Sequence, residues 1–445
     1  MRLGKNIYFT ASLSLILGIT IGVMSVGVAA KNGQQLLLPI KDLQTFNEVL
    51  NQIKLNYVDP IEDSQLLENA IQGMLSELDP HSAYLKPSDW QDLQENISGE
   101  FGGLGIEVTM EDGYVKVVSP IDDTPAQKAG VQAGDLIVKL GDKPVKGMSL
   151  GEAVELMRGK PKTDIRLTIF REGVNRPIEI TVTRAIIKVE SVKQKTLEPG
   201  YGYIRVSNFQ LQTGKNIQDA YKQLTKDNPT LNGLVLDLRN NPGGVLEASV
   251  DVAGLFLDGE MVVYTKGRED DSKRELFAPK GDKSNGVPLI VLVNGGSASA
   301  SEIVAGALQD HKRAIIMGTT TFGKGSVQTI LPLSNQSALK LTIARYYTPL
   351  GRSIQAQGIV PDIEVEMATL TSVKESNEYI KEADLSRHLS NGNGGTEAST
   401  QEKLKAELQA KEGSASEKPL AETDYQLYQA LNLLKSIKIV NSLKQ

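Results

Sequence analysis

The chain has 445 residues, 40% hydrophobic and 23% charged, with a formal net charge of −6. This length and composition allow real cores to be buried, which excludes wholesale disorder, and the acidic balance argues against nucleic-acid binding as the main role. The absence of cysteine excludes disulfides, thiolate metal sites and cysteine nucleophiles, and three histidines disfavour a histidine-rich metal site.

The first thirty residues have the pattern of an export segment. Arg2 and Lys5 precede an uncharged stretch from Ile7 to Ala30, which ends in small residues that suit a signal peptidase. The stretch is also long enough to span a bilayer as an uncleaved anchor. We therefore expect residues 1–30 to be a signal peptide or membrane anchor, with the cleaved signal favoured, and the rest of the chain to lie outside the cytoplasm.

Residues 31–98 are predicted to form an N-terminal helical region. Alternating spacings of three and four separate the apolar residues Leu43, Phe46, Leu50, Ile53 and Tyr57, as in a short heptad seam. This seam could pack on its own domain or on another subunit. A second helical pattern covers residues 64–78, and the turn Asp79-Pro80-His81-Ser82 follows it.

Residues 99–186 have a β-rich texture, with short apolar runs between turn residues and one helical pattern over 149–158. From residue 187 to 370, continuous apolar runs alternate with helical patterns. Runs such as 234–238 and 289–293 are typical of strands buried on both faces of a partly parallel sheet, which indicates an α/β domain.

Residues 371–423 are predicted to be a largely low-complexity linker, because Gly, Ser, Asn, Glu and Lys dominate much of the segment. A C-terminal helix over 424–445 follows, with the apolar stripe Leu427, Ala430, Leu431, Leu434 and Ile437. A helix after a linker has little core of its own. We expect it to dock on another subunit or partner, and the alternative is docking on its own α/β domain.

Two strand-to-helix turns of the α/β domain could hold a reacting oxygen. The first, Asp237–Gly244, ends in paired glycines whose backbone N–H groups can point at a bound oxygen. The second, Asn294–Glu302, has small residues that suit an exposed serine nucleophile, although it lacks the G-x-S-x-G spacing. Alone, the first could be an ordinary turn and the second a serine-rich helix cap.

A lysine between two glycines, Lys324, is the candidate base. The string from Gly318 to Lys324 matches a phosphate loop, but Gly325 stands where a magnesium-binding Ser or Thr is needed, which disfavours an NTPase. His311 lies 12 residues after Ser299 (311 − 299), about 18 Å along one helix and too far for a hydrogen bond. A desolvated lysine can act as a general base, so a serine–lysine pair fits better than serine–histidine.

Taken together, Gly296–Glu302, Phe322–Gly325 with Gln328, and Arg239–Gly244 resemble the carboxyl-terminal processing proteases, also called tail-specific proteases. The resemblance covers about residues 40 to 366. It implies a multidomain α+β protein: a ClpP/crotonase-like α/β protease core at 187–370, an inserted β-rich PDZ domain at 99–186, and helical N- and C-terminal regions.

The same resemblance assigns the site residues and implies neither a metal nor a cofactor. It makes Ser299 the nucleophile and Lys324 the general base, with Gln328 orienting the lysine. It places the oxyanion hole at the N–H of Ala300 and that of Gly243 or Gly244. Glu302, one helical turn after the nucleophile, is a secondary candidate for polar support.

The loop Gly102–Ile106 resembles the carboxylate-binding loop of PDZ domains, with Gly103, Leu104, Gly105 and Ile106 as the binding residues. PDZ domains bind peptide C-termini by adding a strand and capturing the carboxylate with backbone N–H groups. The helix over 149–158 would form the other wall of the groove. Arg158 at its end could couple groove occupancy to the protease domain, or it could be a simple surface cation.

These expectations combine into an extracytoplasmic, periplasmic serine endopeptidase that recognises accessible apolar C-termini and cleaves through an acyl-enzyme. A non-catalytic PDZ scaffold is the alternative, and a crotonase-like thioester enzyme is disfavoured by the export segment. Assembly as a homo-oligomer, an adaptor or activating partner, and association with the inner membrane are also expected.

Overall fold

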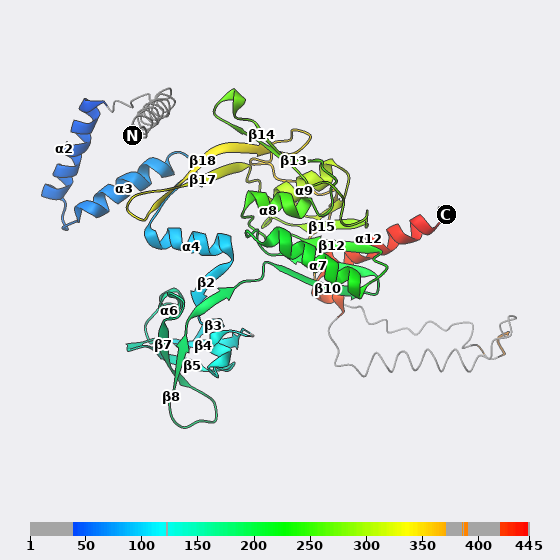
Figure 1. The fold of residues 1–445 in the computed structure, drawn as a ribbon, viewed down its shortest axis with the longest axis horizontal. Helices are drawn as coiled ribbons and strands as arrows, with labels where there is room; N and C mark the ends of the chain where they lie inside the picture. The colour runs from blue at the N-terminus through cyan, green and yellow to red at the C-terminus, as the bar shows by residue number, and fades with distance from the viewer. Residues whose placement is uncertain (1–38, 122, 371–384, 386, 390–418, 444–445) are drawn as a thin grey trace, which may run out of the picture. The chain divides into compact units, whose positions relative to one another are not determined.

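The computed structural model describes residues 39–121, 123–370, 385, 387–389 and 419–443, which Figure 1 draws in colour. Its contacts divide the chain into two compact units, one ending at Glu77 and one beginning at Leu78. The expected export segment, residues 1–30, lies outside the described residues, as does most of the expected linker. No helix in the described part of the chain is long and apolar enough to cross a bilayer.

The described part of the first unit, from residue 39 onward, contains the helices α2 (Ile40–Asn56) and α3 (Asp63–Ser76), which confirms the helices predicted there. Lys54 Nζ donates a hydrogen bond to Asp63 Oδ2 at 2.9 Å and so joins the two. No residue of α2 is buried, and Leu43 and Phe46 are 47% and 46% exposed. The apolar stripe predicted from the heptad spacing is therefore present and uncovered within this unit.

The β-rich domain is an antiparallel sheet with strand order β3-β4-β5-β7-β8, and β6 pairs with β5. Its interior is filled by alternating strand residues such as Val115, Val117 and Ile137, all fully buried. β3 lies at the sheet edge, so one side of it has no strand partner. The elements are β3 (Ile106–Glu111), β4 (Tyr114–Pro120), α5 (Pro125–Lys128), β5 (Leu136–Leu140), β6 (Lys143–Pro144), α6 (Leu150–Met157), β7 (Asp164–Phe170) and β8 (Ile178–Thr183).

A separate two-stranded sheet stands where the chain enters and leaves this domain. β2 (Glu100–Gly103) precedes the domain sheet and β9 (Ala185–Lys188) follows it, and the two pair antiparallel.

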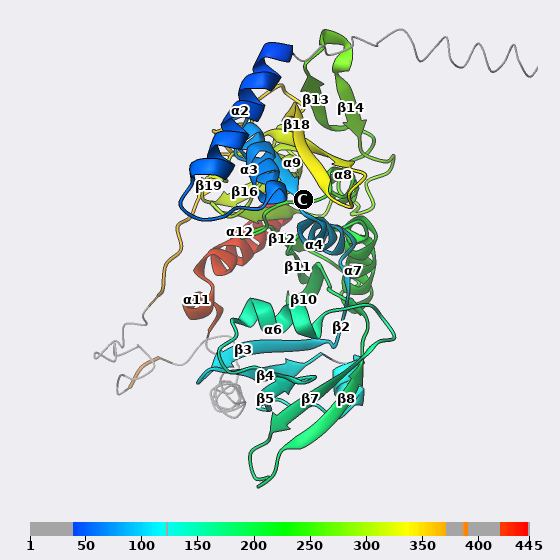
Figure 2. The same cartoon turned by 90° about the vertical axis from the view of Figure 1, so that its left-hand side faces the viewer.

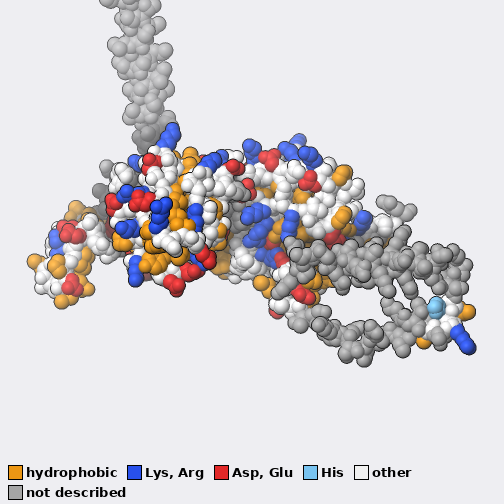
Figure 3. All heavy atoms as spheres, turned by 90° about the horizontal axis from the view of Figure 1, so that it is seen from below, with side chains coloured by type: hydrophobic (Ala, Val, Ile, Leu, Met, Phe, Trp, Pro, Cys, Tyr) orange, Lys and Arg blue, Asp and Glu red, His pale blue; other side chains and the backbone are white. Residues whose placement is uncertain are grey.

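On the face that Figure 3 shows, basic and acidic side chains are interspersed with hydrophobic ones.

The α/β domain is built on a six-stranded sheet with strand order β10-β11-β12-β15-β16-β19, in which only β10 runs antiparallel to its neighbour. The elements are β10 (Val192–Glu198), β11 (Tyr201–Val206), α7 (Thr213–Asp227), β12 (Gly233–Asp237), α8 (Leu246–Ala253), β15 (Leu289–Val293), α9 (Ala300–Asp310), β16 (Ile315–Gly318) and β19 (Ile363–Glu364). The continuous apolar runs of the sequence are thus confirmed as central strands.

A smaller antiparallel sheet lies beside it, with β18 as its centre. β1 and β13 pair with β18, β17 also pairs with β18, and β14 pairs with β13. This sheet brings residues that follow Lys324 next to the turn at Asp79. Its strands are β1 (Ala83–Leu85), β13 (Met261–Gly267), β14 (Arg274–Phe277), β17 (Ser326–Pro332) and β18 (Ala338–Tyr347), and α4 (Pro87–Ser98) follows β1.

The C-terminal helix α12 (Tyr425–Ser442) docks on its own sheet, which contradicts the favoured expectation of another subunit (Figures 1 and 2). α12 docks there because the central strands carry apolar residues on both faces of the sheet. Leu234 and Leu236 of β12 face α7, α8 and α9, whereas Val235 faces the opposite side. On that side it packs with the stripe Leu427, Ala430, Leu431 and Leu434, so α12 covers a sheet face that would otherwise be exposed. The short helix α11 (Leu420–Thr423) precedes it.

Candidate active site

Ser299 lies where β15 ends and α9 begins. Its backbone angles, φ 56° and ψ −113°, are strained for a residue with a side chain, at a cost of about 1–3 kcal/mol. Such strain collects at active sites, and nucleophilic serines on strand-to-helix turns are presented in this way. The turn therefore has the backbone of a nucleophile turn without the G-x-S-x-G spacing.

The two neighbouring serines have structural partners instead. Ser297 Oγ donates to the carbonyl of Leu238 at 2.8 Å, and Ser301 Oγ donates to the carbonyl of Asn241 at 2.9 Å. Both side chains are fully buried. Of the three serines in this segment, only Ser299 lines the adjacent cleft.

This cleft, with a volume of about 540 Å³, brings together five of the six residues expected for catalysis. Its walls are largely apolar and include Leu93 and Ile97 of α4 and Ile303 of α9. Apolar walls favour a ligand with apolar groups. The five expected residues that line the cleft are Gly244, Ser299, Ala300, Lys324 and Gln328.

The sixth residue, Gly243, lies directly behind Ser299. A Cβ atom at Gly243 would be 2.7 Å from Ser299 Cβ and 2.9 Å from Ala300 N, so no larger residue fits there. The Gly243 N–H is already engaged, because it donates to Asn241 Oδ1 at 2.9 Å. Among the described residues, the N–H groups of Gly244 and Ala300 have no such partner. These two donors are the ones available to a bound oxygen.

Lys324 is held by the backbone of its own loop. A Cβ at Gly325 would lie 2.6 Å from Gln355 N, and a Cβ at Gly323 would lie 3.1 Å from Gln357 N. The flanking glycines therefore allow the loop to pack against residues 355–358 while Lys324 reaches the cleft. No hydrogen bond joins Lys324 Nζ to Ser299 Oγ in the described structure. Catalytic hydrogen bonds often tighten only when substrate binds.

Burial lowers the pKa of Lys324, and the positive charge of Lys340 lowers it further. Asp79 and Glu302 act in the opposite direction but do not reverse the shift. The Lys324 charge in turn contributes, after burial, to lowering the pKa of His81. A lysine with a lowered pKa is neutral over more of the physiological pH range, as a general base must be.

Glu302 joins the Ser299 turn to the Lys324 loop. Its Oε2 accepts hydrogen bonds from Ser299 N at 2.7 Å and Lys324 N at 2.9 Å. Its Oε1 accepts from Gly323 N and Thr321 Oγ1, both at 2.6 Å. Burial raises the pKa of this fully buried carboxyl, while the four hydrogen bonds act to lower it. The sequence suggested only polar support here, because the four donors come together only in the fold.

Gln328 lines the cleft, but its amide is not bonded to Lys324. Its Nε2 donates to Ser326 Oγ at 2.9 Å and to Thr342 Oγ1 at 3.2 Å. Thr342 Oγ1 in turn donates to Asp79 Oδ1 at 3.1 Å. No group of His, Asp and Glu suited to a metal ion occurs among the residues that the structure describes.

The expected peptide-binding loop lies between β2 and β3. Gly103 belongs to β2, Leu104 is buried in the β-rich domain, Gly105 has φ 77° and Ile106 opens β3. The Gly105 carbonyl accepts from Ile121 N and Thr124 Oγ1. In contrast, the N–H groups of Leu104 and Gly105 have no partner among the described residues. They lie next to the unpaired edge of β3, and α6 runs beside this strand (Figure 2).

Arg158 follows α6 and is more than a solvated surface cation. Its Nη1 donates to Asp92 Oδ1 at 2.7 Å and to Glu95 Oε2 at 3.3 Å, both on α4. Leu93 and Ile97, also on α4, line the cleft that contains Ser299. Arg158 therefore ties the β-rich domain to the helix that walls the cleft.

Three family models match the chain. The model of peptidase family S41 matches residues 200–365, and the model of the PDZ domain matches residues 102–182. The model of the activating protease CtpB N-terminal domain matches residues 22–88.

Similar proteins include two bacterial carboxy-terminal processing proteases. The one from Bartonella bacilliformis is 48% identical over 86% of this chain and 88% of its own. CtpA of Bacillus subtilis is 38% identical over 72% of this chain and 68% of its own. The solved structure of a photosystem II D1 C-terminal processing protease is 33% identical and covers 73% of this chain and 92% of its own, with a TM-score of 0.42.

Proposed function

The chain belongs to peptidase family S41, the carboxy-terminal processing serine proteases, and from this premise we propose that Ser299 and Lys324 are its catalytic dyad. The observation that carries the proposal is their placement. A strained serine and a lysine with a lowered pKa line one cleft, and Glu302 fixes the backbone of both. No other serine of the turn reaches the cleft.

The proposed reaction is acyl transfer through a covalent intermediate. Neutral Lys324 takes the proton of Ser299 Oγ as this oxygen attacks the scissile carbonyl carbon. The N–H groups of Gly244 and Ala300 bind the oxyanion, and we favour Gly244 over Gly243 because the Gly243 N–H is engaged by Asn241. Lys324 then gives its proton to the leaving amine. Water, deprotonated by the same lysine, releases the acyl group.

We propose that Gln328 orients Lys324 during this reaction. Its amide lies in the cleft and bonds Ser326 and Thr342, so this role requires the amide to turn toward the lysine when substrate is present. We also propose that the core at 187–370 has a ClpP/crotonase-like fold and that 99–186 is the inserted PDZ domain. The parallel sheet with helices on both faces and the PDZ match to residues 102–182 support these assignments.

The PDZ domain suggests that the substrates are proteins with accessible C-termini, and we propose that their last residues are apolar. The free N–H groups of Leu104 and Gly105 would capture the carboxylate, and the peptide would add a strand to β3. We further propose a periplasmic location and association with the inner membrane, from the pattern of residues 1–30. The match to the CtpB N-terminal domain suggests an adaptor or activating partner.

Substrate tails test this recognition. An unfolded protein ending in two apolar residues is expected to be cleaved with a KM about tenfold lower than the same protein ending in two aspartates. Amidation of the apolar tail should remove the advantage, because an amide lacks the carboxylate charge. A short peptide that occupies only the cleft is the control. Equal KM values for the free and amidated tails would contradict capture of the C-terminus.

We propose that the uncovered face of α2 pairs with a second copy of the chain. Its apolar residues repeat with heptad spacing and remain about half exposed within their own unit. Phe46→Glu is expected to convert a dimer or larger assembly to a monomer in light scattering, while Gln52→Glu, on a different face of α2, should not. A wild-type protein that is monomeric at working concentration would refute this assembly.

A further inference from the structure

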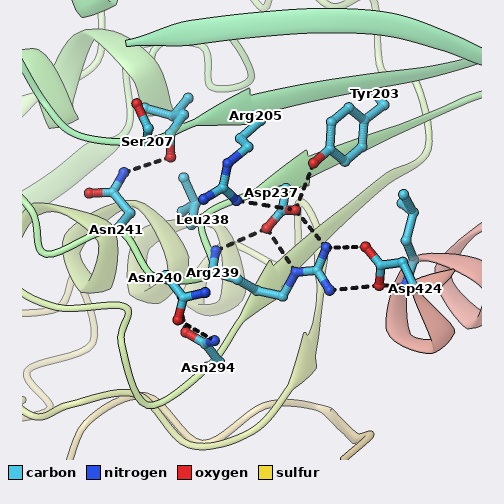
Figure 4. Close-up of polar contacts among 12 residues, drawn as sticks. Tyr203, Arg205, Ser207, Asp237, Leu238, Arg239, Asn240, Asn241, Asn294 and Asp424 are labelled. Atoms are coloured by element: carbon cyan, nitrogen blue, oxygen red, sulfur yellow. Dashed lines mark hydrogen bonds and ion pairs between the residues drawn. The ribbon is translucent and has the colours of Figure 1, made fainter. Parts of the chain in front are cut away.

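The C-terminal helix is bound to the α/β domain by an ion pair as well as by its apolar stripe. Asp424, the N-cap of α12, accepts from Leu427 N at 3.0 Å. The same carboxylate accepts two hydrogen bonds from Arg239, from Nη1 at 2.8 Å and from Nη2 at 2.7 Å (Figure 4). Although burial acts to raise it, the pKa of Asp424 is lowered, mainly through Arg239.

Asp237, at the end of β12, also binds the guanidinium group of Arg239. Nε donates to Asp237 Oδ1 at 3.0 Å and Nη2 donates to Oδ2 at 2.7 Å. Asp237 is fully buried and also accepts from Tyr203 Oη at 2.8 Å (Figure 4). A guanidinium held by two bidentate carboxylates has little freedom, since planar fork geometry fixes direction as well as distance.

Arg239 begins the loop that leads to the proposed oxyanion donor. The next residue, Asn240, exchanges hydrogen bonds with Asn294, at 2.8 Å from its backbone N–H and 2.9 Å to its side chain (Figure 4). The carbonyl of Asn241 then accepts from Ala298 N and Ser301 Oγ, both at 2.9 Å. Every residue from Arg239 to Asn241 is thus bonded either to α12 or to the turn that carries Ser299.

We propose that Asp424 is a positioning residue for catalysis: through Arg239, the C-terminal helix fixes the loop 239–244 so that the Gly244 N–H faces the oxyanion. The inference rests on the proposed dyad and oxyanion hole. In this proposal α12 supports the geometry of the active site, although Asp424 and Arg239 are 185 residues apart in the chain.

Other interactions keep α12 docked when the ion pair is weakened. Leu427, Ala430, Leu431 and Leu434 are buried against the sheet, and Gln426 Nε2 donates to the carbonyl of Val365. Asp424→Asn keeps the size of the side chain and one oxygen that accepts from Arg239. It removes the negative charge and replaces the second acceptor oxygen by an NH₂ group. The loop is therefore expected to loosen while the fold persists.

Asp424→Asn tests the proposal against two matched controls on the same helix. Lys435→Gln breaks the ion pair between Lys435 and Glu198, 2.6 Å in length, without touching Arg239. Leu434→Ala weakens docking of α12 through a buried side chain. With a short peptide substrate, Asp424→Asn should lower kcat about tenfold to hundredfold with KM within about twofold, since small displacements of catalytic groups have effects of this size. Lys435→Gln should match wild type.

Hydrogen exchange of the bonded amides of Asn240, Asn241 and Gly243 provides a second readout that does not depend on proteolysis. These amides should exchange faster in Asp424→Asn than in Leu434→Ala when the two variants are compared at equal thermal midpoints. Unchanged kcat and exchange in Asp424→Asn would overturn the proposal, as would equal losses in Leu434→Ala. If Asp424→Asn does not fold, Asp424→Glu, which keeps the charge but shifts the carboxylate, decides by the same criteria. Failure of Ser299-dependent hydrolysis in wild type would refute the proposed function, and the exchange result would still decide whether Asp424 fixes the loop.

Discussion

Ser299→Ala and Lys324→Ala are each expected to lower kcat/KM for protein cleavage by about 10⁴-fold or more. The first removes the only serine of its turn that reaches the cleft, and the second removes the base. The double variant should be no worse than either single one, because residues that act as a unit show non-additive losses. Thermal midpoints measured on each variant check that the loss of activity is not caused by unfolding. Cleavage by Ser299→Ala at the wild-type rate would contradict the assignment.

Lys340→Met tests whether the pKa of Lys324 sets the pH dependence of activity. Lys340 lines the cleft and its charge lowers the pKa of Lys324, whereas Asp79 and Glu302 raise it. Removing the Lys340 charge therefore raises the Lys324 pKa, so less neutral base is present at a given pH. The acid limb of the kcat/KM–pH profile should move to higher pH, with activity retained above the limb. The Lys340 charge also contributes, after burial, to lowering the pKa of His81, so the pKa of this histidine is expected to rise in the variant as well.

Glu302→Gln is expected to lower kcat about 10²-fold or more and to destabilise the fold by about 2–4 kcal/mol. The carboxylate accepts from two donors on each oxygen, and an amide replaces one acceptor by a donor that faces N–H or O–H groups. Both the turn of Ser299 and the loop of Lys324 lose part of their support. Kinetics with a short peptide, combined with denaturant unfolding, measures both effects.

Glu152→Gln is a matched control for this substitution. Glu152 occupies the same capping-box position at the start of α6, with Ser149 as its partner, but it is exposed and belongs to the β-rich domain. It should leave kcat for a short peptide unchanged. A wild-type kcat in Glu302→Gln would show that the carboxylate serves the helix cap alone.

Local patterns in the sequence predicted the elements that depend on local physics. Runs such as 234–238 are strands because both faces of the sheet are covered, and the short helix over 149–158 is present within a residue at each end. α4 was not predicted, although it walls the cleft. It is short, with Trp90, Leu93 and Ile97 as its large apolar residues, and the role of Leu93 and Ile97 depends on α4 lying against the distant Ser299 turn.

The sequence predicted residues that line the cleft, but not the contacts that connect them. Ser299 could be chosen among three serines only through the family resemblance, because the buried bonds of Ser297 and Ser301 reach the carbonyls of Leu238 and Asn241, far away in the chain. Glu302 accepts hydrogen bonds from backbone groups about 20 residues away in the chain. Asp424 at the start of α12 bonds Arg239, which is 185 residues away. No pattern of residue spacing predicts contacts between residues so far apart in the chain.

Labelling with a fluorophosphonate probe across a range of pH tests the serine–lysine pair most directly. Mass spectrometry should find one adduct, on Ser299, whose rate of formation rises with pH as Lys324 loses its proton. Lys324→Ala should label at a rate several orders of magnitude lower. An adduct on another residue, or equal labelling of Ser299 in wild type and Lys324→Ala, would contradict a dyad in which neutral Lys324 activates Ser299.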